Sequence, residues 1–169
     1  MILTGRRVVL RPAVPGDVER ITEIRHEPEV LRRWGIPERG ELEEFLGQPT
    51  TFVIEVGGQT IGAIQFHEEP DPMYRHAGID LFLATSWHNQ GLGSEAVAVL
   101  AAHLIRERGH HRLTIDPAAD HTAAIRAYEK VGFKRIGVMR DYELGPDGTW
   151  HDGLLMDLLA GEFREPWGQ

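Results

Sequence analysis

The clearest chemical signal in this chain is a loop with two glycines, between a strand-like run at 78–84 and an apolar-periodic helix at 91–108. The loop comprises His88, Asn89, Gln90, Gly91, Leu92, Gly93 and Ser94. The first N–H groups of a helix have no intrahelical partner, and the helix dipole adds positive potential at the same end. These residue types at this spacing therefore predict a pyrophosphate site, and with it a nucleotide-bearing cofactor.

Two other phosphate-binding folds use glycines in a similar way. The pattern Gly91-x-Gly93-x-x-Ala96 also fits a Rossmann dinucleotide fingerprint, which is a weak signal by itself. A Rossmann fold places that loop after the first strand of repeated βαβ units, whereas here it follows a predicted antiparallel meander. The Gly-Lys-Ser/Thr of a Walker loop is absent from the sequence. The position of the loop therefore argues against a Rossmann fold, and the missing residues argue against a Walker loop.

The elements that must position the loop follow from turn residues and hydrophobic periodicity. Gly57-Gly58 between two β-rich runs indicates a hairpin, and Gly132 indicates the end of a helix. The polar segment 67–76 is predicted to be a loop. Strands are predicted at 5–12, 51–56, 60–66, 78–84, 112–116, 133–139 and 150–159, and helices at 17–26, 29–34, 38–46, 91–108 and 121–131.

A second motif lies downstream of the glycine loop. It runs from Asp116 to Phe133 as Asp-Pro-Ala-Ala-Asp-His-Thr-Ala-Ala-Ile-Arg-Ala-Tyr-Glu-Lys-Val-Gly-Phe. Together with the loop, this motif resembles the GNAT superfamily of N-acetyltransferases. In that family the loop binds the pyrophosphate of coenzyme A, and the second motif lies along the pantetheine arm. The order of predicted strands fits the family across nearly the whole chain.

The resemblance implies one GNAT domain over residues 1–169, of the α/β (α+β) class. Its single mixed, mostly antiparallel sheet would carry helices on both faces and a splayed acetyl-CoA cleft between two parallel strands. The implied cofactor is acetyl-CoA. In two places the sequence departs from the family: His88 stands where Gln or Arg is usual, and His121 where Asn is usual. The residues implied to bind the cofactor are Phe82, Leu83, Ala84, His88, Asn89, Gln90, Gly91, Leu92, Gly93, Ser94, His121, Ala124 and Tyr128.

Tyr128 is a candidate catalytic acid. The departing thiolate of coenzyme A needs a proton, and a phenol on a helix beside the sulfur can supply one. In the family the matching tyrosine has this role. Spacing alone would favour a tyrosine that merely packs, with its hydroxyl at the edge of the domain. The resemblance reverses that preference.

The acceptor amine must lose a proton before it attacks, because an unperturbed alkyl ammonium has a pKa near ~10. Asp80 alternates with Ile79 and Leu81, so it faces the opposite side of its strand. A carboxylate in an apolar strand costs free energy unless it is paired or solvated in a cleft. We therefore expect Asp80 to be a site carboxylate and candidate base, or else to pair with Arg75 or Arg112. Backbone amides around 81–83 would hold the acetyl carbonyl, as in the family.

Further carboxylates surround these strands. Glu68, an alternative base, and Glu69 end the strand before Asp80 in an acidic lip that would attract a polycation, or that is simply a solvated loop. Asp80 and Asp116 also look like two acidic positions of aminoglycoside 6′-N-acetyltransferases. In those enzymes the matching aspartates contact ammonium groups of the drug. Asp147 is a further acidic candidate, although Pro-Asp-Gly is also a turn sequence. The candidate substrate-binding residues are thus Glu68, Glu69, Asp80, Asp116 and Asp147.

Composition narrows the partners. The formal net charge of −8 disfavours nucleic acid, which needs basic patches. The excess carboxylates are free to serve a cationic partner, but composition by itself favours a role in solubility alone. No apolar run approaches the ~20 residues of a membrane span. The chain has no cysteine, which excludes a cysteine acyl-enzyme. Its histidines lack the spacing of a metal site. We therefore expect direct transfer of the acetyl group in a ternary complex without metal. A strand pattern that starts at Ile2 predicts no signal peptide and a cytoplasmic location.

Three functions remain open on the sequence alone. The first is acetylation of an aminoglycoside 6′-amine, which would make the chain an antibiotic-resistance enzyme. The second is acetylation of protein N-termini, because the opening residues 6–12 also resemble the enzymes that acetylate ribosomal proteins. The third is a non-catalytic module that binds acetyl-CoA, against which the presence of Tyr128 counts. Either a monomer or a homodimer is compatible with the sequence.

Overall fold

One sheet of eight strands organises the chain in the computed structural model, which describes residues 1–167, and its strand order is β1-β2-β3-β4-β5-β6-β8-β7. All neighbouring strands pair antiparallel except β5 and β6, which are parallel. The mixed, mostly antiparallel sheet expected from the sequence is therefore confirmed. The strands are β1 (Leu3–Thr4), β2 (Val8–Arg11), β3 (Thr51–Val56), β4 (Gln59–Glu68), β5 (Ala77–Leu83), β6 (Arg112–Ile115), β7 (Lys134–Leu144) and β8 (Trp150–Leu159).

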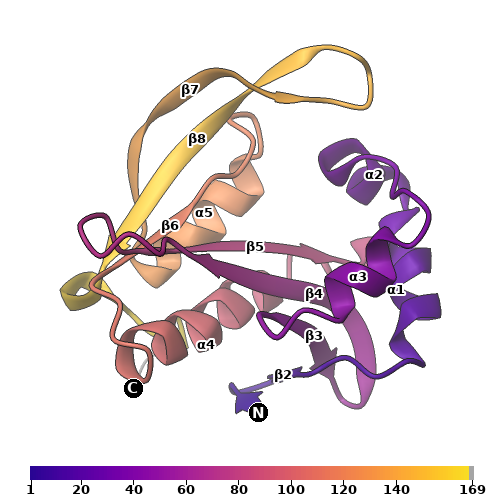
Figure 1. The fold of residues 1–169 in the computed structure, drawn as a ribbon, viewed down its shortest axis with the longest axis horizontal. Helices are drawn as coiled ribbons and strands as arrows, with labels where there is room; N and C mark the ends of the chain where they lie inside the picture. Colours follow the sequence, from indigo (N-terminus) through magenta and orange to yellow (C-terminus); the bar gives the residue numbers. More distant parts are fainter. Residues whose placement is uncertain (168–169) are drawn as a thin grey trace.

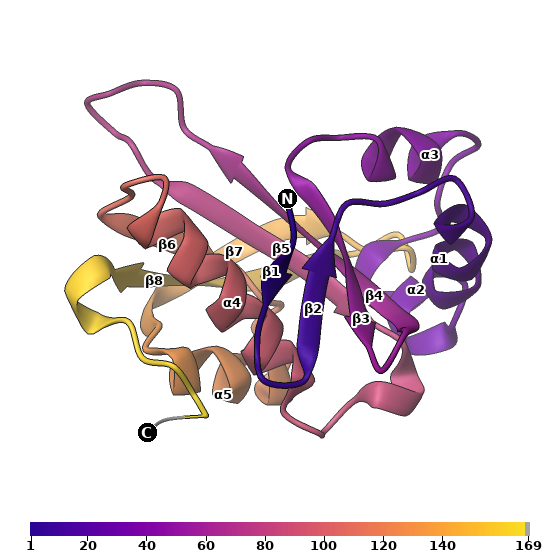
Figure 2. The same cartoon turned by 90° about the horizontal axis from the view of Figure 1, so that it is seen from below.

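Helices cover both faces of the sheet, as predicted. On one face α4 and α5 bury a large apolar cluster that includes Leu100 and Ile64, and on the other the N-terminal helices bury a smaller cluster with Ile21 and Phe82. Figure 2 shows these two groups of helices on opposite sides of the strands. The helices are α1 (Asp17–Arg25), α2 (Pro28–Trp34), α3 (Glu41–Leu46), α4 (Leu92–Arg106) and α5 (Thr122–Val131), with 3-10 turns at Thr85–Trp87 and Ala160–Glu162.

The two parallel strands separate soon after they meet. β5 pairs with β6 only at Ala77↔Leu113 and Gly78↔Thr114, while its pairing with β4 continues to Leu83. Residues 79–83 of β5 therefore have no ladder partner on the β6 side. This divergence is the splaying that the sequence analysis expected between the two parallel strands.

The β7–β8 hairpin is longer than the sequence indicated. β7 continues past Met139 to Leu144, through a register shift between Met139 and Glu143 where Asp141 has a φ of 48°. Such a bulge lets a strand bend and redirect its side chains. Figure 1 shows the hairpin extending beyond α5 with its turn toward α2. Two consecutive polar residues, Arg140 and Asp141, interrupt the strand pattern after Met139, which is why this extension was not predicted.

Other element boundaries differ by only a few residues. β4 runs on to Glu68, and α3 begins at Glu41 rather than 38 because Gly40, with a φ of 82°, precedes it. Gly132 ends α5 as predicted, with a φ of 113° that a side chain would disfavour. Within residues 1–167, no helix has the length and apolar composition needed to cross a membrane.

Candidate active site

The glycine loop folds against the end of β5 and leads directly into α4. Asn89 and Gly91 both take positive φ, at 59° and 77°, which turns the chain into the helix. His88 Nε2 hydrogen-bonds the carbonyl oxygen of Leu83 at 2.9 Å, so this side chain fixes the loop to the strand. The amides of the first turn, from Leu92 to Ser94, have no intrahelical acceptor. The loop therefore presents several N–H groups at one point, which is the geometry an anion requires.

One edge of β5 presents its backbone to the diverging β6. The backbone groups of Phe82 and Ala84 point toward β4. The carbonyl oxygen of Phe82 lies so close to β4 that a Cβ on Gly62 would come within 2.1 Å of it. The amide of Ala84 donates to the carbonyl oxygen of Ile61 at 2.7 Å. Because successive residues of a strand alternate, Leu81 and Leu83 direct theirs to the open side. The Phe82 ring instead packs against Trp34 with centroids 5.1 Å apart, in the N-terminal core.

Tyr128 lies on the inner face of α5. Its side chain is only 9% exposed, and its ring packs edge-on against Phe133 with centroids 6.4 Å apart. Burial raises the pKa of the Tyr128 hydroxyl, and the charges of Asp80 and Asp116 raise it further. The phenol therefore stays protonated across the physiological pH range, as a proton donor must.

The start of α5 carries the other residues expected along the cofactor arm. His121 precedes the helix and is half-buried, and burial lowers its pKa, with Arg33 adding to the effect. The carboxylate of Asp120, the residue before His121, forms an ion pair with Arg33 at 2.7 Å. Ala124 is half-buried one turn before Tyr128. These side chains share one end of α5, beside α2.

Asp80 projects from the middle of β5 on the face away from α4. Gln65 lies directly opposite on β4. Burial raises the pKa of the Asp80 carboxyl, and the charge of Asp116 raises it further. The alternative of an ion pair with Arg75 or Arg112 is wrong, because Arg75 donates to the Arg108 and Gly109 carbonyls and Arg112 pairs with Asp157.

A group of carboxylates forms around Asp80 from separate strands. Asp116, at the end of β6, accepts a hydrogen bond from the Tyr142 hydroxyl at 2.6 Å. Burial raises the pKa of Glu143, and Asp116 adds to the effect, so these two carboxylates lie close enough to repel. Sequence reasoning missed Tyr142 and Glu143. The one available signal was the short alternation of polar and apolar residues in 141–144, which is compatible with a strand.

His67 borders this group. Its ring lies directly over Gly78, where a Cβ would come within 2.3 Å of Cε1. Its charge lowers the pKa of Asp80, against the effect of burial. Only a glycine at position 78 leaves room for the imidazole over this strand. The sequence therefore places the imidazole of His67 near Asp80.

The structure does not bring Glu68 to the Asp80 group. Glu68 follows Phe66 by two residues and shares its face of β4, the one that packs toward α4. Its carboxylate pairs with Arg108 and with the buried His110, and mainly the hydrogen bond from Arg108 lowers its pKa to about 2. A carboxylate with so low a pKa is a poor base at neutral pH.

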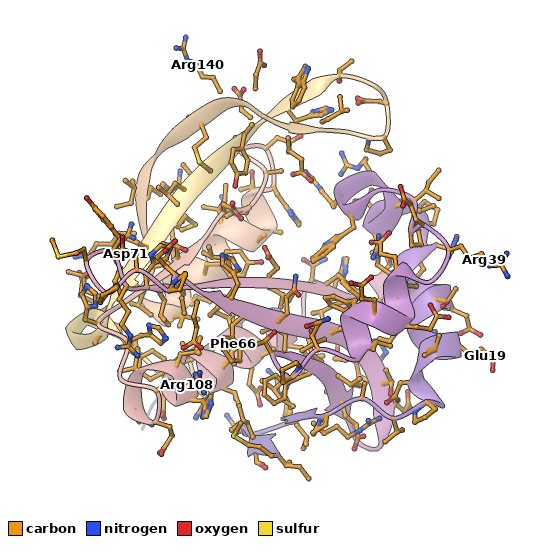
Figure 3. All side chains as sticks on the ribbon, viewed as in Figure 1. Glu19, Arg39, Phe66, Asp71, Arg108 and Arg140 are labelled. Carbon is orange, nitrogen blue, oxygen red and sulfur yellow. The ribbon has the colours of Figure 1, made fainter. Side chains whose placement is uncertain are left out.

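Glu69 and Asp147 lie at two separate turns. The Glu69 carboxylate accepts the amide of Asp71, in the β4–β5 loop. Figure 3 shows Asp71 and Arg108 at one end of the molecule and Arg39 of the α2–α3 connection at the other. Asp147 accepts the Thr149 amide in the β7–β8 turn and contacts His151 at 3.0 Å, an interaction that lowers its pKa to about 2.

Among residues 1–167, no three His, Asp or Glu side chains are arranged to hold a metal.

Comparison with known proteins gives a consistent result. Residues 7–134 match the family model of the acetyltransferase (GNAT) domain. Aminoglycoside N(6′)-acetyltransferase type 1 of Klebsiella pneumoniae is 29% identical over 164 residues, covering 83% of this chain and 79% of the relative.

Solved structures share the fold at lower identity. A GNAT-family acetyltransferase from Bacillus anthracis superposes with a TM-score of 0.85 at 21% identity, covering 96% of this chain and all of that one (100%). Mycobacterium smegmatis RimJ in complex with CoA-disulfide superposes with a TM-score of 0.82 at 23% identity, covering 96% and 88% of the two chains.

Proposed function

We propose that this chain, which belongs to the GNAT acetyltransferase family, acetylates a primary amine of a small polycation, namely the 6′-amine of an aminoglycoside. Members of this family take the acetyl group from acetyl-CoA. The observation that carries the proposal is the group of three carboxylates, Asp80, Asp116 and Glu143, beside the buried hydroxyl of Tyr128. The similarity to the Klebsiella enzyme supports the choice of acceptor.

The residues present fit the coenzyme. The first-turn amides of α4 suit its pyrophosphate, and the open side of β5 suits the amide groups of its pantetheine arm, since Leu81 and Leu83 lack a ladder partner there. Bound acetyl-CoA supplies the acetyl group as a thioester. The backbone N–H of Leu81 or Leu83 would hold the acetyl carbonyl oxygen as negative charge develops on it.

Asp80 and Tyr128 would divide the two proton transfers between them. A raised pKa makes the Asp80 carboxylate a better base at neutral pH, and it would take a proton from the acceptor ammonium directly or through one water. The amine then bonds to the acetyl carbon while the bond to sulfur breaks. Tyr128 would donate its proton to the departing sulfur, because its own raised pKa keeps it protonated. Its oxygen would then recover the proton that the newly acylated nitrogen must lose to become a neutral amide.

Asp116 and Glu143 would recognise the rest of the acceptor. The raised pKa values of Asp80 and Glu143 both partly reflect repulsion from the carboxylate of Asp116, and an ammonium placed among these carboxylates removes that repulsion. The hydrogen bond from the Tyr142 hydroxyl holds one carboxylate oxygen of Asp116 in place. An acceptor with several ammonium groups can satisfy this pair while presenting another amine to Asp80.

Thiol release from acetyl-CoA against a panel of amines tests the proposal. The panel contains aminoglycosides with a 6′-amine, polyamines, amino acids and peptides with the N-terminal sequences of ribosomal proteins. Release with the aminoglycosides supports the proposal. Release with peptides alone would move the chain to protein N-terminal acetylation, and binding of acetyl-CoA without release on any amine would indicate a non-catalytic module.

A further inference from the structure

A buried carboxylate joins the N-terminal strands to the coenzyme loop. Glu95 lies in the first turn of α4 with its side chain 2% exposed. Its carboxylate accepts the backbone amides of Arg7 and Val8, the latter at 2.9 Å, and the Arg7 Nε at 3.0 Å. Burial alone would raise the pKa of Glu95, but these donors lower it overall. Glu95 is therefore ionised, and it fixes β2 and Arg7 against the start of the helix.

Arg7 extends from this carboxylate across the loop. Its Nη1 donates to the carbonyl oxygen of Gln90 at 2.9 Å, and its Nη2 would lie 3.3 Å from a Cβ on Gly91. The side chain is 47% exposed, and the hydrogen bonds described engage only one of the N–H groups on Nη1 and Nη2. Nη2 therefore lies beside Gly91, the residue that directly precedes the first turn of α4.

We propose that Arg7 binds a phosphate of the coenzyme and that Glu95 is the positioning residue that holds Arg7 for this contact. Guanidinium N–H pairs match phosphate oxygens in geometry and charge. A chain with a net charge of −8 repels a polyanion at long range, so a cation at the phosphate loop offsets that repulsion where the coenzyme binds. The proposal concerns the coenzyme alone and is independent of the acceptor.

Equilibrium binding tests this proposal without any turnover. Dissociation constants are measured by calorimetry for coenzyme A and 3′-dephospho-coenzyme A, and by ligand-observed NMR for pantetheine. The variant is Arg7→Gln, and the matched control is Arg6→Gln, which removes the same charge from the neighbouring exposed residue. We expect Arg7→Gln to weaken coenzyme A by roughly 10- to 100-fold, the value of a charge-assisted hydrogen bond, with pantetheine and Arg6→Gln nearly unchanged.

The ligand series also identifies the phosphate. A loss that persists with dephospho-coenzyme A assigns the contact to the pyrophosphate, and a loss seen only with coenzyme A assigns it to the 3′-phosphate. The loss should shrink at high salt, because screening weakens the wild-type contact. Equal loss for pantetheine, or no loss with any ligand, would overturn the proposal. If Arg7→Gln does not fold, Arg7→Met, which also carries no charge, replaces it under the same criteria.

Glu95 gives an independent readout. Glu95→Gln keeps acceptors for the backbone amides but removes the charge that holds Arg7. We expect it to weaken coenzyme A by a smaller factor than Arg7→Gln and to add nothing when the two substitutions are combined, because both act through one contact. Additive losses in the double variant would show that Glu95 does not act through Arg7.

Discussion

Replacing Tyr128 with phenylalanine separates catalysis from packing at the proposed site. The ring is buried on Phe133, and phenylalanine preserves that contact. Burial and the two nearby aspartates set the hydroxyl's pKa, and the residues of 1–167 that shift it include no hydrogen-bonding partner. Its removal therefore leaves no orphaned group. We expect the free energy of unfolding to change by less than about 1 kcal/mol, which for this size is a Tm shift below ~4 °C.

Turnover should respond very differently. The hydroxyl stays protonated at neutral pH, and a positioned acid contributes about 10²–10³-fold, or roughly 3–4 kcal/mol of barrier. We therefore expect Tyr128→Phe to lower kcat by that factor in a thiol-release assay while the Kd for coenzyme A stays the same. The lost activity should not return at any pH between 6 and 9, since no other group takes the role.

A second tyrosine provides the matched control. Tyr74 is 71% exposed in the β4–β5 loop, and Tyr74→Phe should leave kcat, Kd and Tm unchanged. The reasoning is refuted if Tyr128→Phe retains wild-type kcat. It is equally refuted if kcat falls only in proportion to a large drop in Tm, because the hydroxyl would then act through structure.

Three further substitutions test individual contacts. Asp80→Asn should lower kcat at least ~10²-fold yet raise Tm at pH 7. Burial raises the folded-state pKa of Asp80 above 3.8, so ionisation of this carboxyl lowers the stability of the wild type as pH rises from 3.8 through the folded-state pKa. Calorimetry should therefore find no rise in Tm for the variant below pH 3.8. Glu68→Gln should keep kcat and lower stability by about 1–2 kcal/mol at pH 7, because the Glu68 pKa falls from 4.5 to about 2 on folding. The stability difference between variant and wild type should vanish as pH approaches 2. A loss of kcat at pH 7 would instead show that Glu68 acts as a base. Gly132→Ala should cost at least about 1–2 kcal/mol in denaturant unfolding, since its Cβ would lie 2.4 Å from Glu162 O at a φ of 113°, and wild-type stability would contradict that geometry.

The sequence predicted the elements that have local signals. Gly132 marks the end of α5, Gly57-Gly58 the β3–β4 turn, and Gly91 the start of α4, because each position needs a backbone conformation that other residues disfavour. The parallel pair and its divergence were predicted through the resemblance carried by two motifs. The extension of β7 was missed because a strand exposed along its length need not alternate polar and apolar residues.

The partners of charged side chains were not predictable, because they are set by tertiary packing. Arg7 and Glu95 are separated by 88 positions, and Arg108 and Glu68 by 40, so no spacing rule connects them. Asp80 was singled out by its place in an apolar strand. Glu143 joins it only through the bulge in β7, a feature without a distinct local signal.

The central claim is tested most directly by two aminoglycosides that differ only at the 6′ position. Neomycin carries an amine there and paromomycin a hydroxyl, so all other ammonium groups are the same. We predict thiol release from acetyl-CoA with neomycin, loss of that release in Asp80→Asn and Tyr128→Phe, and no release with paromomycin. Equal release with both drugs, or release with neither, would contradict the proposed acceptor.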